Sequence, residues 1–180
     1  SSDVCSSDLY ALKLIHALEP LRFEWIEECL PPDDFDGYSR LVRDRSHPIQ
    51  ITTGEHEYGR WGFDTLLGTG VDVIQPDVNW CGGLTELLKI KALASARNRM
   101  VIPHGSSVYS YHFSIASDVT PFSEFLMMAP QADHVAPMFD PLFVNEPVPV
   151  DGHIDVGETP GFGVELNPKL RWVRPYPGVG

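Results

Sequence analysis

The amino-acid sequence predicts an α/β fold, in which a parallel sheet covered by helices forms part of a TIM-like barrel. Apolar strand-like runs alternate with helical segments, and the strands begin near residues 22, 49, 71, 100 and 122, which is the spacing of βα units. Polar residues follow several successive strands, which favours a barrel over a doubly wound sheet with one crevice. Five units do not close an eight-stranded barrel, so either earlier strands are missing or the sheet is open.

Residues 71–83 (VDVIQPDVNWCGG) form the clearest unit of this pattern. Its β-branched residues predict a buried strand, and Pro76 ends that strand because proline has no backbone N–H to donate. Asp77 follows at once, which places a carboxylate at the carboxyl end of a parallel strand. Gly82 and Gly83 then open a helix that we expect to cover residues 83–97.

The remaining elements are shorter. We expect helices at residues 10–18, 35–44, 63–67 and 108–116, and strands at residues 22–28, 49–53, 100–103 and 122–128. Residues 1–9 repeat Ser-Ser-Asp without periodicity, and we interpret them as a non-native head that precedes the βα units of residues 10–129. Residues 130–180 are rich in Pro and Gly, and we expect them to cover the barrel end with one late helix or strand.

Composition excludes several classes of partner. The 180 residues suffice for one domain, and the net charge of -12 argues against nucleic acid and against anionic lipid. No apolar run is long enough to span a membrane. Three separated cysteines, which form no CxxC pair, indicate reduced thiols and a cytoplasmic location: Cys5, Cys29 and Cys81.

Ionisable residues follow five successive predicted strands: Glu27 or Glu28, Glu55, Asp77, His104 and Glu124. Carboxylate oxygens suit a hard cation such as Mg²⁺. A histidine beside an aspartate from the neighbouring strand is the arrangement of a general base. A single acidic residue at a strand end is more commonly a helix cap or a solvated group. Five such residues in register favour a common site.

Four segments resemble a known family: WIEECLPP (25–32), TTGEHEYGRWGF (52–63), IQPDVNWCGGLTE (74–86) and IPHGSSVYSYHF (102–113). They resemble the mandelate racemase subgroup of the enolase superfamily, and GEHEYGRWGF and CGGLTE are similar to its rhamnonate dehydratase branch. GETPGFGVELNP (157–168) resembles the C-terminal segment of that group. The resemblance implies the C-terminal portion of a (β/α)7β barrel, without the N-terminal capping domain.

The resemblance also implies roles for individual residues. Glu27 and Glu55 would be Mg²⁺ ligands, with Glu28 the lesser candidate. The catalytic residues would be Asp77 and His104, as a dyad, and Glu124, which would hydrogen-bond an enediolate; His56 would face the substrate. The third carboxylate ligand of the family belongs one strand before Trp25, and neither Asp3 nor Asp8 is assumed to replace it.

The implied activity is that of a Mg²⁺-dependent carbon–oxygen lyase that dehydrates an acid sugar, of the L-rhamnonate to 2-keto-3-deoxy-L-rhamnonate type. The reaction would begin with abstraction of the proton α to the carboxylate. The intact enzyme is expected to be a homo-oligomer, and the 180-residue chain alone to be inactive. The alternatives are another acid-sugar dehydratase or a racemase of the subgroup, an inactive fragment, and a small-molecule binding module.

Overall fold

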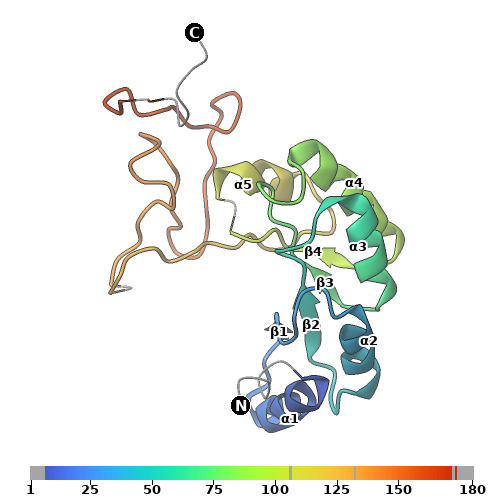
Figure 1. The fold of residues 1–180 in the computed structure, drawn as a ribbon. Helices are drawn as coiled ribbons and strands as arrows, with labels where there is room; N and C mark the ends of the chain where they lie inside the picture. Colours follow the sequence, from blue (N-terminus) through green and yellow to red (C-terminus); the bar gives the residue numbers. More distant parts are fainter. Residues whose placement is uncertain (1–6, 106, 132, 172, 174–180) are drawn as a thin grey trace. The chain divides into compact units, whose positions relative to one another are not determined.

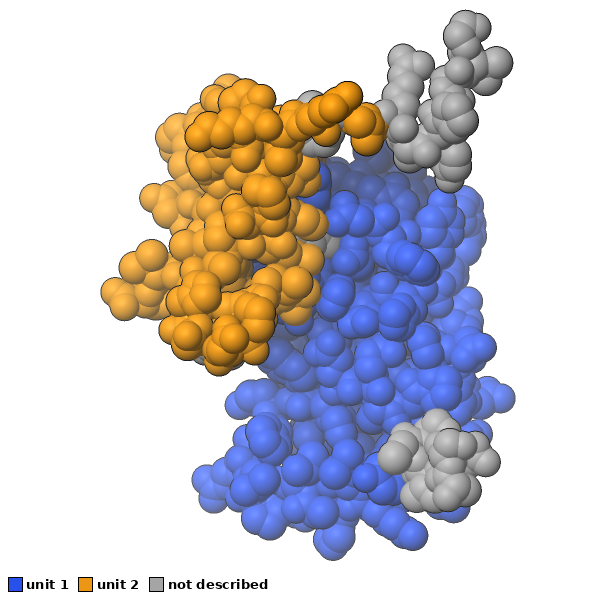
Figure 2. Space-filling view, turned by 60° about the vertical axis from the view of Figure 1, so that its left-hand side comes forward, with its two compact units in different colours: residues 1–124 blue, residues 125–180 orange. Residues whose placement is uncertain are grey.

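The computed structural model describes residues 7–105, 107–131, 133–171 and 173. The chain divides into two compact units, Ser1–Glu124 and Phe125–Gly180, which Figure 2 shows in different colours. All helices and strands found in the described residues lie in the first unit. Within the described residues, no helix combines the length and the apolar character that crossing a bilayer requires.

The first unit contains a parallel sheet whose strands follow one another in chain order. The strands are β1 (Trp25–Glu27), β2 (Gln50–Thr53), β3 (Val73–Ile74) and β4 (Met100–Val101). Each neighbouring pair is parallel. The connections are α2 (Phe35–Asp44), α3 (Gly59–Gly68) and α4 (Leu84–Ala96), which lie on one side of the sheet (Figure 1). The predicted βα repeat is therefore confirmed.

Side-chain alternation along the strands separates the core from the site. Ile51, Ile74 and Val101 point to the helical side, where they share one buried cluster with side chains from the three helices: Tyr38, Leu41, Phe63, Leu66, Leu87 and Ile90. Glu27 is the register partner of Thr52, and both point to the opposite side. Burial of apolar residues on the helical side thus fixes which strand residues face away from the helices.

Helix α1 (Asp8–Leu18) begins two residues earlier than the sequence predicts. The Ser7 side chain accepts a hydrogen bond from Tyr10 N, so it caps the helix, and Asp8 pairs with Arg40 at 2.5 Å. Asp8 and Leu9 therefore belong to the fold rather than to a separate head. A single 3₁₀ turn, η2 (Glu19–Leu21), follows this helix. The other head residues that we interpreted as non-native, 1–6, lie outside the described residues, and Cys5 with them.

The other predicted elements differ from the structure mainly in their ends, with one exception. Helix α5 covers Val108–Ile115, close to its expected position, and contacts α4. The strand predicted at residues 122–128 is wrong, because those residues contain no strand. Pro121 precedes them and cannot donate to a ladder, and Phe122 is exposed rather than covered by a neighbouring strand.

The described part of the second unit consists of loops and turns. Two isolated bridges occur in it, between Phe143 and Leu166 and between Val150 and His153. Its described residues, 125–131, 133–171 and 173, form neither a helix nor a ladder of strands, so the late element that we expect in 130–180 does not occur among them. The proline and glycine content accounts for this, because proline removes backbone donors and glycine disfavours regular structure. That the unit covers the barrel end stays a prediction.

Candidate active site

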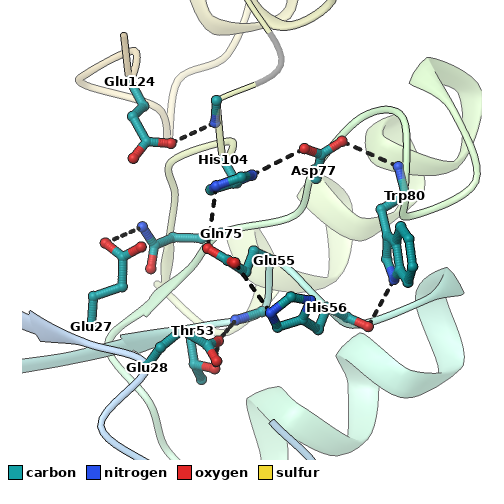
Figure 3. Close-up of polar contacts among 12 residues, drawn as sticks. Glu27, Glu28, Thr53, Glu55, His56, Gln75, Asp77, Trp80, His104 and Glu124 are labelled. Carbon is teal, nitrogen blue, oxygen red and sulfur yellow. Dashed lines mark hydrogen bonds and ion pairs between the residues drawn. The ribbon is translucent and has the colours of Figure 1, made fainter. Parts of the chain in front are cut away.

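The predicted site residues come from the carboxyl ends of all four strands (Figure 3). Glu27 is the last residue of β1, and Glu55 follows β2 by two positions. Asp77 and His104 each follow their strand by three positions, after β3 and β4. Because the strands are parallel and in order, these four side chains lie at one end of the sheet.

His104 and Asp77 contact each other directly. The Nδ1 atom of His104 lies 3.0 Å from Oδ2 of Asp77, while Oδ1 of the same carboxylate accepts hydrogen bonds from the backbone N–H groups of Asn79 and Trp80, at 2.7 and 3.2 Å. The turn after β3 therefore holds one oxygen of Asp77 and presents the other to the imidazole. The His104 N–H donates to the Pro76 carbonyl at 3.2 Å, which joins the two loops through their backbones.

The second nitrogen of His104 faces Glu55. The Nε2 atom lies 3.2 Å from Glu55 Oε2, and Glu55 Oε1 lies 3.2 Å from His56 Nε2. The hydrogen bond with Asp77, together with the charges of Glu55, Glu124 and Asp77, outweighs burial and raises the pKa of His104 to about 9. The imidazole of His104 therefore lies between two carboxylates, both of which favour its protonated form.

Glu124 joins this cluster although it lies on no strand. Its Oε2 atom accepts a hydrogen bond from Gly105 N at 2.5 Å, one residue after His104. Burial raises the pKa of Glu124, and the nearby charges of Glu27 and Glu55 act in the same direction. The hydrogen bond from Gly105 and the charge of His104 oppose this rise. Glu124 thus lies within the electrostatic reach of both predicted ligands.

The two neighbouring glutamates at the end of β1 have different surroundings. Glu27 is exposed, and its Oε2 atom accepts a hydrogen bond from Gln75 Nε2 at 2.8 Å. Glu28 has a positive φ of 46°, and its Oε1 atom accepts hydrogen bonds from the Thr53 hydroxyl and from Gly54 N. Glu28 therefore holds the end of β2, whereas Glu27 keeps an oxygen available for another partner.

The carboxylates at this end of the sheet are the side chains that could hold Mg²⁺. In the described part of the chain, no three His, Cys, Asp or Glu side chains stand close enough together to hold a metal ion. Glu27 and Glu55 supply two carboxylates, and both act on the pKa of Glu124. Mg²⁺ is commonly held by one or two protein carboxylates together with water and substrate oxygens. The chemistry of this pair therefore fits Mg²⁺.

A hollow of about 270 Å³ opens beside the dyad. It is lined by Glu55, His56, Asp77, Asn79, Trp80 and His104. Trp80 closes one side of it: its Nε1 atom donates to the His56 carbonyl at 2.9 Å, and its ring meets the His56 ring edge-on, with centroids 6.4 Å apart. The hollow brings His56 together with the base and one predicted ligand.

Three residues of this region were not predicted from sequence: Gln75, Asn79 and Trp80. Gln75 had a signal that could have identified it, because it is a polar residue at the end of an otherwise apolar buried run. It is only 4% exposed, so its amide needs partners within the protein. Asn79 and Trp80 lie in a loop, where polar and aromatic residues carry no such signal.

Comparison with known proteins identifies the family of this chain. Residues 5–170 match the family model described as "Enolase C-terminal domain-like". A curated L-rhamnonate dehydratase from Saccharopolyspora erythraea is 58% identical over 168 residues, which are 93% of this chain and 43% of that protein. The crystal structure of L-rhamnonate dehydratase from Gibberella zeae is 48% identical, with a TM-score of 0.84. The match covers 90% of this chain and 42% of the Gibberella zeae chain.

A second structure from Gibberella zeae, rhamnonate dehydratase complexed with Mg, is 47% identical with a TM-score of 0.85. This match covers 90% of this chain and 40% of the matched chain. The chain therefore spans less than half the length of the relatives it matches. The matched residues include the whole parallel sheet and the loops that carry the dyad and both predicted ligands. The chain belongs to the enolase C-terminal domain-like family.

Proposed function

We propose that the protein to which this chain belongs is a Mg²⁺-dependent dehydratase of L-rhamnonate, which removes water after abstraction of the proton next to the carboxylate. The observation that carries the proposal is the contact of His104 with Asp77 on one side and with Glu55 on the other. The 58% identity to an L-rhamnonate dehydratase supports the choice of substrate.

His104 is the proposed general base. The neutral imidazole is the form that takes a proton. Its Nδ1 atom is engaged by Asp77, so Nε2, on the side of the ring that faces Glu55, is the nitrogen proposed to take the proton from the substrate. The carboxylate of Asp77 holds the ring in one orientation and stabilises the imidazolium formed when the proton is taken. The Asn79 and Trp80 backbone donors hold Asp77 in turn, so the dyad is oriented before substrate arrives.

Glu27 and Glu55 are the proposed Mg²⁺ ligands. When bound, the ion supplies positive charge that stabilises the negative charge developing on the substrate carboxylate. Both side chains present oxygen donors at the same end of the sheet as the dyad. Glu55 also contacts His104, so the proposed base lies next to a proposed ligand.

Glu124 is the proposed hydrogen-bond donor to the enediolate. Burial raises the pKa of Glu124, and a carboxyl group that carries a proton can donate a hydrogen bond to a developing oxyanion. Gly105 N fixes one oxygen of this carboxyl group. His56 is the proposed substrate contact, because its exposed side chain lines the hollow beside His104. The departing hydroxyl needs a proton, and both histidines border this space.

The small-molecule partner under this proposal is an acid sugar. We also propose a cytoplasmic location, which agrees with the free thiols of Cys29 and Cys81. A homo-oligomeric assembly of the intact enzyme stays a prediction. A binding module with the same hollow would retain the acid sugar unchanged, so turnover distinguishes it from a dehydratase.

The test is His104→Asn in the full-length protein. We expect turnover of L-rhamnonate to fall by about 10²-fold or more, because the base is lost, while Mg²⁺-dependent binding of the substrate is kept. His16→Asn is the matched control, since His16 is exposed on α1. Turnover at the wild-type rate in His104→Asn would remove His104 from its role. Racemisation in place of dehydration would overturn the proposed reaction, and faster dehydration of another acid sugar would replace the proposed substrate.

A further inference from the structure

We propose that Gln75 is a positioning residue for Glu27, which holds one carboxylate oxygen of this ligand and leaves the other to the cation. The inference rests on the proposed function of Glu27 as a Mg²⁺ ligand. Gln75 lies directly after β3, in the same segment as Asp77. It contacts Glu27, which belongs to β1.

The amide of Gln75 is held at both ends. Its Nε2 atom donates to Glu27 Oε2 at 2.8 Å, and its Oε1 atom accepts from the Thr52 hydroxyl. An ionised carboxylate can only accept, so the NH₂ group of the amide has to face Glu27 and the carbonyl has to face Thr52. The two partners together determine the orientation of the amide, which is 4% exposed.

The contact spans three strands. Glu27 of β1 and Thr52 of β2 are register partners, and Thr52 is in turn the partner of Val73 of β3. Gln75 lies two residues beyond Val73, so its side chain points to the same side of the sheet and reaches back across β2 (Figure 3). The position of the Glu27 carboxylate is thereby tied to the segment that carries Asp77.

The chemistry of a glutamine suits this task. An amide donates a hydrogen bond without positive charge, so it orients Glu27 without competing with a cation for it, as lysine or arginine would. In the described part of the chain, Glu27 Oε1 accepts no hydrogen bond, and this is the oxygen left for a metal ion. Ligand-orienting partners of this kind commonly strengthen metal binding by 10–100-fold.

A purely structural role is the alternative reading. A buried amide with satisfied partners stabilises the sheet whether or not Glu27 binds a cation. The two readings differ in one respect: a structural role predicts lost stability with unchanged affinity for the ion, whereas a positioning role predicts weaker binding of the ion by a folded protein.

The experiment uses the full-length protein with Gln75→Leu and Gln75→Met, and with Gln50→Leu as the matched control. Gln50 is also a glutamine of this sheet, but it lies at the first residue of β2, opposite Trp25. Mg²⁺ binding is measured by calorimetry without substrate, and kcat is measured over a range of Mg²⁺ concentrations. We expect the affinity for Mg²⁺ to fall about tenfold in both Gln75 variants. Saturating Mg²⁺ should restore much of their kcat. Gln50→Leu should match wild type in both measurements.

Glu27→Gln separates this inference from the proposed function. If Glu27→Gln loses the ion while the folded Gln75 variants bind it as tightly as wild type, the positioning role is wrong and the metal site stands. If Glu27→Gln binds Mg²⁺ normally, the proposed ligand itself is wrong. Should both Gln75 variants fail to fold, Thr52→Val keeps Gln75 and frees its carbonyl end, and unchanged affinity in that variant overturns the inference.

Discussion

His104 contacts Glu55 through its Nε2 atom, 3.2 Å from Glu55 Oε2, on the side of the ring that faces away from Asp77. These two residues follow β4 and β2, which are separated in the sheet by β3. The contact shows that the loops after non-adjacent strands reach the same point. A proposed base and a proposed metal ligand thus form one polar cluster, in which a change at either residue alters the surroundings of the other.

Asp77→Asn is expected to lower kcat for L-rhamnonate by about 10²–10⁴-fold with a much smaller change in KM. The amide can no longer stabilise the imidazolium, although it keeps the shape of the side chain. The largest contribution that raises the pKa of His104 is lost as well, so the pKa falls. Steady-state kinetics measure the first effect, and NMR titration of the histidine measures the second.

Asp64→Asn serves as the control for that variant, because Asp64 is an exposed aspartate of α3 whose partner is Arg97. It should leave kcat and KM at wild-type values. An Asp77→Asn enzyme with normal kcat would show that His104 does not depend on Asp77.

Glu27→Gln and Glu28→Gln are expected to affect different properties, Mg²⁺ affinity in the first variant and stability in the second, although the two residues are neighbours. Glu27→Gln should weaken Mg²⁺ binding with little change in stability, since its carboxylate is exposed. Glu28→Gln should keep Mg²⁺ affinity and lose about 1 kcal/mol of unfolding free energy, because the bonds to Thr53 and Gly54 lose their charge. Calorimetry and denaturant unfolding measure the two quantities. The reverse pattern would exchange the assignments of the two glutamates.

Cys29 and Cys81 are expected to resist thiol reagents in the folded protein. Burial raises the pKa of each thiol to about 11, so at pH 8 only about one molecule in a thousand carries the reactive thiolate. In a Cys5→Ser background, the colour reaction with a disulfide reagent should be slow in buffer and rapid in guanidinium chloride. Rapid reaction of both thiols in buffer would contradict the burial of these side chains.

The 180-residue chain alone is expected to bind Mg²⁺ more weakly than the full-length protein and to turn over no L-rhamnonate. Its described residues bring together two proposed carboxylate ligands but no group of three metal-binding side chains. Calorimetry on the isolated chain and an assay for the 2-keto product measure both properties, with the full-length protein as the reference. Turnover by the chain alone at the full-length rate would show that Glu27 and Glu55 suffice as ligands.

Much of the fold could be predicted from sequence because it depends on local patterns. Helix α2 begins and ends at the predicted residues, since Asp34 caps it and its apolar positions have helical spacing. The strand before Asp77 was recognisable from its β-branched residues and from Pro76, although the ladder itself is limited to Val73–Ile74. The order of the strands also follows from the repeat, because successive βα units place each strand beside the previous one.

Contacts between distant residues depended on the tertiary structure. The sequence alone determined the βα repeat and which polar residues end its strands, because both arise from the order of side chains along a few consecutive residues. It predicted a strand around Glu124, yet Glu124 reaches the site from a loop through Gly105 N. The bond from Gln75 to Glu27 joins residues 48 positions apart, and it exists only because β1, β2 and β3 pair in one register. Packing of the apolar sides of these strands against the helices sets that register. It thereby decided that Glu27 faces Gln75, whereas its neighbour Glu28 faces Thr53 and Gly54.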